Sequence, residues 1–173
     1  MPSIVRYAMG GNSRAMVDYR VEPEIYAMAM LRDVAREAAK NRITQYPLHI
    51  KLDTGMHRMG FVEEELPEML DFLAAQDNVT IASVFSHLAT ADCPGTIDFE
   101  RQVKRFSEAV NALRAAGINP GIVHAANSAA AIRSPEVQLD MVRPGTSLSG
   151  VQPCPQAYPM THQKPATSVN ASS

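Results

Sequence analysis

The sequence predicts an α/β fold in which about six parallel strands alternate with helices. Short apolar runs typical of buried strands alternate along the chain with longer amphipathic segments. Most of these runs are followed by a segment long enough for the crossover that parallel strands require. The chain has 173 residues, of which 46% are hydrophobic and 20% charged, so a packed core is expected rather than disorder. Doubly wound sheets and barrels both fit this pattern.

The N-terminal half contains three predicted strands and two predicted helices. Pro23 suits the first turn of a helix, and the Ala-rich segment 24–41 has few helix breakers. Segment 63–76 carries Leu66, Met69 and Leu73 on one helical face. The apolar runs that predict strands are residues 3–9, the weaker run 16–21, and residues 47–53.

The C-terminal half continues the alternation. Residues 79–86 form the strongest strand pattern, and short strands are predicted at 121–126 and 139–143. A short helix is predicted over 128–133. A longer helix is predicted by a 4-3-4-3 spacing, with Gly117 at its C-terminal cap; its apolar residues are Phe99, Val103, Phe106, Val110 and Leu113.

Composition indicates the domain limits and argues against several classes of protein. We expect residues 1–152 to form one domain and residues 153–173 a poorly ordered tail rich in Pro, Gln, Ser, Thr and Asn. The net charge of −2 gives no general case for nucleic-acid binding. No apolar run approaches the length of a membrane helix, and the N-terminus lacks a signal-peptide pattern. Cys93 and Cys154 are therefore expected to be reduced thiols in a cytoplasmic protein.

Polar residues follow four of the predicted strands at the point where each strand ends. Because the carboxyl ends of parallel strands meet at one mouth, these side chains are expected to form a single site. Taken singly, each has a plainer structural interpretation, such as a helix N-cap for Asn127. In chain order the residues are Lys51, Arg58, His87, Asn127, Ser128, Arg143, Gly145 and Thr146.

The site is expected to bind a phosphorylated cofactor. Asn127 and Ser128 offer a hydroxyl and backbone N–H groups at a helix start, and Gly145 with Thr146 offers further N–H groups. Arg143 beside them is suited to the rest of that cofactor. The tripeptide Asp53-Thr54-Gly55 also occurs in aspartic proteases, but the long predicted helices argue against that all-β fold. Neither dinucleotide-binding nor Walker glycine motif is present, and the histidines show no metal-ligand spacing.

Four segments together resemble pyridoxal-phosphate-dependent alanine racemases, whose N-terminal domain is a (β/α)8 barrel. They are HIKLDTGMHRMGF at 49–61, FSHLATAD at 85–92, HAANSAA at 124–130 and DMVRPG at 140–145. The resemblance runs over residues 1–150 and implies an incomplete TIM-type (β/α)8 barrel with about six of its eight strands. Segment 18–31 is most similar to racemases fused behind the cell-wall ligase that adds D-Ala-D-Ala.

The resemblance implies a role for each matching residue. Arg58 would hold the substrate carboxylate, and Lys51 would carry a carbamate that fixes this arginine. Arg143 would face the pyridine nitrogen and, being always protonated, would not hand over a proton, which favours racemisation over transamination. His87 would lie beside the ring. The residues on the phosphate side would be Asn127, Ser128, Gly145 and Thr146.

The resemblance also implies that both catalytic bases are missing. The family's cofactor-linked lysine lies on the first barrel strand, and its catalytic tyrosine lies on a C-terminal β-domain of the partner subunit. Neither matches a residue here, where the lysines are Lys40, Lys51, Lys104 and Lys164. We therefore expect an interior fragment of a homodimeric enzyme that interconverts L- and D-alanine for peptidoglycan, inactive by itself. The alternatives are a non-catalytic barrel remnant that binds cofactor or a partner, and another racemase or decarboxylase of the same barrel superfamily.

Overall fold

The computed structural model describes residues 13–93, 95, 97–150 and 153, and in them four parallel strands form one sheet. The strand order follows the chain, β1-β2-β3-β4, so each strand lies beside its predecessor. This order is that of a barrel, because the strand order of a doubly wound sheet reverses at a switch point. The strands are β1 (Glu24–Ile25), β2 (Tyr46–Lys51), β3 (Val79–Phe85) and β4 (Ile122–His124).

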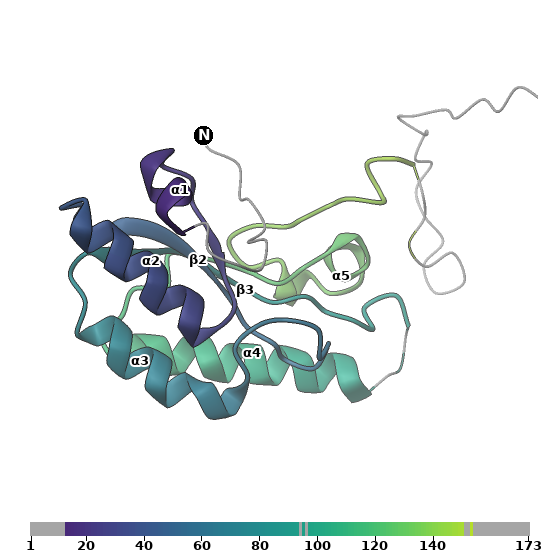
Figure 1. Cartoon of the computed structure of the whole chain (residues 1–173). Helices are drawn as coiled ribbons and strands as arrows, with labels where there is room; N and C mark the ends of the chain where they lie inside the picture. The colour runs from purple at the N-terminus through teal and green to yellow at the C-terminus, as the bar shows by residue number, and fades with distance from the viewer. Residues whose placement is uncertain (1–12, 94, 96, 151–152, 154–173) are drawn as a thin grey trace, which may run out of the picture.

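The helices connect the strands, and α2, α3 and α4 lie along the same side of the sheet in Figure 1. A crossover helix between parallel neighbours is the arrangement that barrels and other α/β folds share. The bounds are α1 (Ser13–Asp18), α2 (Met28–Lys40), α3 (Leu66–Ala74), α4 (Ile97–Ala115) and α5 (Ser128–Arg133), with 3₁₀ turns η1 (Glu63–Glu65) and η2 (Pro135–Val137).

The core lies between the sheet and these helices. Alternate residues of the strands, Ile25, Leu48, Ile50 and Val84, are fully buried in it. The buried side chains of α2 and α4 pack into the same apolar cluster. Burial of each large aliphatic side chain stabilises the fold by about 1.5–3 kcal/mol. Successive strand residues point to opposite faces, so the polar residues between these apolar ones lie on the inner face, away from the helices.

Two predictions for the N-terminal region are wrong. Segment 16–21 was predicted as a strand but contributes to α1, whose buried Met16 and Val17 pack toward α2. The helix predicted over 24–41 begins only at Met28. Residues Glu24 and Ile25 pair with β2 instead, and the N–H of His49 donates to the carbonyl of Pro23 at 3.0 Å. Pairing with a neighbouring strand overrides the weak local preference for helix.

Most other predicted elements are confirmed with small shifts of their ends. Strands 47–53, 79–86 and 121–126 and helices 63–76, 99–113 and 128–133 are all present. Gly117 ends α4 with a left-handed φ of 74°. Segment 139–143 forms only a bridge between Asn127 and Arg143, because the Asp140 carboxylate accepts from the Val123 N–H at 2.8 Å beside β4.

The predicted strand 3–9 and the predicted tail 153–173, apart from Pro153, lie outside the described residues. In the part of the chain that is described, no helix is long and apolar enough to cross a membrane.

Candidate functional site

Three side chains form a row across the inner face of the sheet at the ends of its strands. Lys51 pairs in register with Phe85, and Phe85 with His124. The Phe85 and His124 rings are stacked with centroids 5.1 Å apart, and the Lys51 ammonium lies 5.7 Å from the Phe85 centroid. The row provides an aromatic floor next to positive charge, because a cation is attracted to the face of an aromatic ring.

Arg143 lies over this floor and is held by backbone carbonyls. Its Nη2 donates to the carbonyl of Ser86 at 2.6 Å and to that of Ala125 at 3.2 Å. Its Nη1 contacts Nδ1 of His124 and donates to the His124 carbonyl at 3.3 Å. Its guanidinium carbon is 5.5 Å from the Phe85 centroid. The two terminal nitrogens are thus engaged by the protein, which fixes the orientation of the guanidinium.

His87 is surrounded by the positive charges that the sequence predicted to gather. Burial lowers the pKa of His87 below its usual range, and the charges of Arg143, Arg58 and Lys51 lower it further. The charges of Arg58 and Arg143 therefore both act on the His87 imidazole. Arg58 itself is exposed, and within the described residues it forms no ion pair.

The loop that carries Arg58 folds back onto the end of β2. The N–H of Asp53 donates to Phe61 and the N–H of Phe61 donates to Lys51, both at 2.9 Å. Asp53 Oδ1 accepts from the N–H groups of residues 55, 56 and 57, each at 3.0 Å. Burial acts to raise the pKa of Asp53, but these donors outweigh it and the pKa lies below its usual value.

Three donors converge on one oxygen at the predicted phosphate side. Ser128 Oγ accepts from the N–H of Gly145 at 2.9 Å, the N–H of Ser147 at 3.3 Å and the hydroxyl of Ser147 at 3.1 Å. Asn127 caps α5 through its Oδ1, which accepts from Ala130, and its Nδ2 donates to the Leu88 carbonyl at 3.0 Å. The predicted Asn127–Ser128 and Gly145–Thr146 segments are therefore in contact.

A buried glutamine on α4 joins the loops after β2 and β3. Gln102 accepts from the N–H of Ala89 at 2.8 Å and donates to the carbonyl of His87 at 3.1 Å. It also lies 3.4 Å from the Thr54 hydroxyl, which is itself 2.7 Å from Ser86 Oγ. These contacts hold the backbone of His87 relative to the Asp53–Phe61 loop.

Most of the predicted residues border one open cavity of about 520 Å³. A cavity of this size is in the range that small-molecule ligands occupy. Six of the eight predicted residues line it, whereas Lys51 and Arg58 do not; the six are His87, Asn127, Ser128, Arg143, Gly145 and Thr146.

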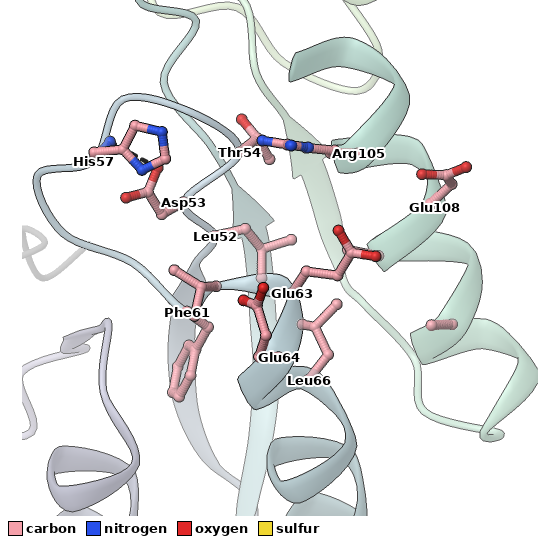
Figure 2. A pocket seen from close by; sticks show the side chains of 13 residues that line it. Leu52, Asp53, Thr54, His57, Phe61, Glu63, Glu64, Leu66, Arg105 and Glu108 are labelled. Atoms are coloured by element: carbon pink, nitrogen blue, oxygen red, sulfur yellow. Dashed lines mark hydrogen bonds between the residues drawn. The ribbon is translucent and has the colours of Figure 1, made fainter. Parts of the chain in front are cut away.

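A second cavity of about 390 Å³ lies on the helical side of the Asp53–Phe61 loop (Figure 2). In Figure 2 Arg105 and Glu108 extend toward it from α4, and Glu63 and Glu64 from η1. None of the predicted site residues lines it, so it is separate from the predicted site. Within the described residues no group of three or more His, Cys, Asp or Glu side chains is placed to hold a metal.

Three polar residues of this region were absent from the predicted set: Glu24, Gln102 and Ser147. Local propensity predicts a helix at Glu24, whereas this residue pairs in the sheet and its carboxylate lies 3.1 Å from the Lys51 ammonium. The alternation of Glu22 and Glu24 around Pro23 was the available signal for an extended segment. Gln102 and Ser147 carry no local signal, because their partners are distant in the sequence.

Comparison with known proteins identifies the family. Residues 3–153 match the family model of the alanine racemase N-terminal domain. The chain is 41% identical over 125 residues to the alanine racemase of Nostoc sp., covering 72% of this chain and 32% of that protein. It is 33% identical over 153 residues to that of Treponema denticola, covering 87% and 40%.

Solved structures agree with the sequence comparisons. Alanine racemase from D-cycloserine producing Streptomyces lavendulae superposes with a TM-score of 0.80 at 26% identity, covering 90% of this chain and 42% of that one. The Corynebacterium glutamicum alanine racemase has the same TM-score and identity, with 96% and 46% covered. The chain spans between a third and two fifths of the length of these curated relatives. It therefore belongs to the alanine racemase family, and its α/β fold with a sequentially ordered parallel sheet is part of that family's TIM-type barrel domain.

Proposed function

We propose that this chain contributes the cofactor-binding part of a pyridoxal-phosphate-dependent alanine racemase barrel. The observation that carries the proposal is the 520 Å³ cavity, because phosphate-type donors at Ser128 and Gly145, the cation of Arg143 and the imidazole of His87 line the same space. Pyridoxal phosphate supplies a ring that withdraws electrons from a bound amino acid and so acidifies its α-proton. One solved structure similar to this chain is that of alanine racemase from Bartonella henselae with covalently bound pyridoxal phosphate.

The residues on the phosphate side of the cavity suit the phosphate group of pyridoxal phosphate. Gly145 N–H, Ser147 N–H and the Ser147 hydroxyl already converge on the single oxygen of Ser128. A phosphate oxygen accepts the same donors more strongly because it is charged. A Cβ built on Gly145 meets no atom within 4 Å, so there is open space next to this N–H. We assign Asn127 to the cap that fixes Ser128, and Thr146 to the cavity wall.

The residues on the other side of the cavity suit the pyridine ring of the cofactor. The terminal nitrogens of Arg143 are occupied by carbonyls and His124, so Nε–H is the donor that remains for a ring nitrogen. Arginine keeps its proton near neutral pH and can only donate. The lowered pKa of His87 keeps its imidazole neutral at neutral pH, so the histidine adds no further cation next to Arg143. The exposed guanidinium of Arg58 is available to pair with the carboxylate of alanine.

The chain alone is proposed to be inactive. Of the lysines in the described part, Lys40 and Lys104 are largely exposed on helices and Lys51 is paired with Glu24. None is free in the cavity to link the cofactor, and the tyrosine expected from a partner subunit has no counterpart here. We propose that the longer protein is a cytoplasmic homodimer that supplies D-alanine for peptidoglycan, with residues 1–152 as the barrel portion.

A binding experiment on the purified chain tests the cofactor site. Pyridoxine phosphate serves as the probe, because it has the phosphate and ring but no aldehyde to react with surface lysines. We expect it to bind while pyridoxine without phosphate does not. Gly145→Asp should abolish binding by placing a carboxylate beside the phosphate donors, whereas the isosteric Gly145→Asn should retain most of it. Equal binding by both variants would contradict the site.

An activity measurement separates this proposal from its alternatives. With pyridoxal phosphate and L-alanine, the chain should racemise no faster than the free cofactor, because positioned acid–base groups each contribute roughly 10²–10⁴-fold and both are missing. A rate far above that control that disappears in Lys51→Ala would mean that Lys51 links the cofactor. If the chain binds neither pyridoxine phosphate nor pyridoxal phosphate, the alternative of a non-catalytic barrel remnant with a different partner is favoured.

A further inference from the structure

The inner face of the sheet holds a buried ion pair that the sequence did not indicate. Glu24 on β1 and Lys51 on β2 are each only 7% exposed, and Glu24 Oε1 lies 3.1 Å from Lys51 Nζ. The strands β1 and β2 are hydrogen-bonded neighbours, with Glu24 opposite His49 in the register. Two charges are seldom buried in a protein unless each compensates the other.

We propose that Glu24 is a positioning residue of the site, and that its carboxylate holds Lys51 as an unmodified ammonium against the ring of Phe85. The lysine is then fixed between an anion on one neighbouring strand and an aromatic face on the other, 5.7 Å from its ammonium. The charge of Glu24 also acts on Arg143, which lies over the same ring: burial lowers the pKa of Arg143 and this charge raises it.

Other charged groups do not replace this carboxylate. Glu22, two residues earlier on the same face, is engaged with Nε2 of His49 at 2.9 Å. Asp53 is turned to the backbone N–H groups of its own loop. Within the described residues, Glu24 forms the single ion pair of Lys51.

This arrangement is incompatible with the carbamate that the family resemblance implied for Lys51. A carbamate forms when the neutral amine attacks carbon dioxide; a new N–C bond forms and one amine proton is released. The Glu24 carboxylate, 3.1 Å from this nitrogen, already stands beside it as the counterion. The product would also place two anions side by side in a buried space. Glu24 therefore takes the place of the carbamate as the negative group beside Lys51.

The test is carbon-13 NMR of the purified chain equilibrated with ¹³C-bicarbonate. We expect no carbamate signal from Lys51 in the wild-type chain. Glu24→Gln removes the negative charge beside the buried Lys51 amine, so a carbamate would no longer face a second anion. A bicarbonate-dependent signal should therefore appear, and it should vanish in Glu24→Gln/Lys51→Arg. Glu24→Asp, which keeps the anion, should remain without signal. Glu22→Gln is the matched control, because it removes an equal charge from the same face without contacting Lys51, and it should also give none.

Two outcomes would overturn the proposal. The first is a carbamate signal in the wild-type chain that is lost in Lys51→Arg. The second is a folded Glu24→Gln variant that gives no carbamate signal. If glutamine prevents folding, Glu24→Thr provides a smaller neutral replacement. This experiment requires neither cofactor nor alanine. A negative result would therefore contradict the role of Glu24 but not the proposed racemase function. Conversely, a negative result in the cofactor-binding test would not contradict the role of Glu24.

Discussion

Arg143 Nη1 lies against Nδ1 of His124, and both groups pack on the ring of Phe85. Because arginine can only donate, His124 must accept at Nδ1 and carry its proton on the buried Nε2. Nε2 has no hydrogen-bond partner among the described residues. Burial first, and then the charge of Arg143, lower the pKa of His124 from 6.5 to about 4.

This contact predicts a loss of stability in mild acid. The folded chain holds His124 neutral, while the unfolded chain protonates it near pH 6.5, so the unfolded state binds more protons between about pH 6.5 and 4. The full contribution, about 3 kcal/mol, is present above that range and is lost as the pH falls through it.

Urea unfolding at successive pH values measures this effect. His124→Gln keeps an acceptor for Arg143 but does not titrate, so its stability curve should be flatter than that of the wild type over this range. His57→Asn is the control: His57 is exposed with a left-handed φ of 53°, which asparagine tolerates, and the wild-type slope should persist. Identical slopes in both variants would contradict the assignment.

The Glu24–Lys51 pair predicts strong coupling in a double-mutant cycle. Glu24→Met or Lys51→Met alone leaves one buried charge without its partner and should cost about 3–5 kcal/mol of unfolding free energy. The combination Glu24→Met/Lys51→Met should recover most of this loss, because no uncompensated charge remains. Glu108→Gln removes an exposed partner of Lys104 and should leave stability nearly unchanged. Additive losses in the cycle would mean that the pair is not coupled.

Replacement of Gln102 should loosen the two loops it joins. Gln102→Leu removes the part-buried hydrogen bonds that Gln102 forms with the Ala89 N–H and the His87 carbonyl, at a cost of about 1–3 kcal/mol. Hydrogen exchange of the Ala89 amide should become faster. Gln138→Leu removes a single exposed hydrogen bond to Ala131 and should change stability by less than about 0.5 kcal/mol. Unchanged exchange at Ala89 would show that the loops do not depend on Gln102.

A side chain at Gly60 should disrupt the loop that carries Arg58. A Cβ at this position would lie 2.5 Å from the backbone N of Asp53, at a φ of +132°. Gly117→Ala is the matched control, since its φ is +74° and nothing lies within 4 Å of the added Cβ. Calorimetry should show about 1–2 kcal/mol lost at Gly117, from backbone strain alone, and a clearly larger loss at Gly60. Equal losses would mean that the loop moves to admit the methyl group.

The local elements and the group of predicted site residues could be read from the sequence. The spacing of Phe99, Phe106 and Leu113 predicted α4, and alternating runs predicted β2 and β3, because these patterns depend on one face of one element. The position of Ser128 and Arg143 at strand ends predicted that they would share a cavity, since parallel strands end at the same edge.

The tertiary structure decided what depends on partners far apart in the chain. Local propensity favoured helix at Glu24 and strand at Met16, and pairing with β2 and packing on α2 reversed both. The same pairing brought Glu24 to Lys51, and packing of α4 brought Gln102 to His87. The sequence by itself therefore determined the family and most of the element types, and it predicted which residues would line one cavity. Only the folded chain determined which charges face each other, because burial and Coulomb attraction act between side chains that no local pattern connects.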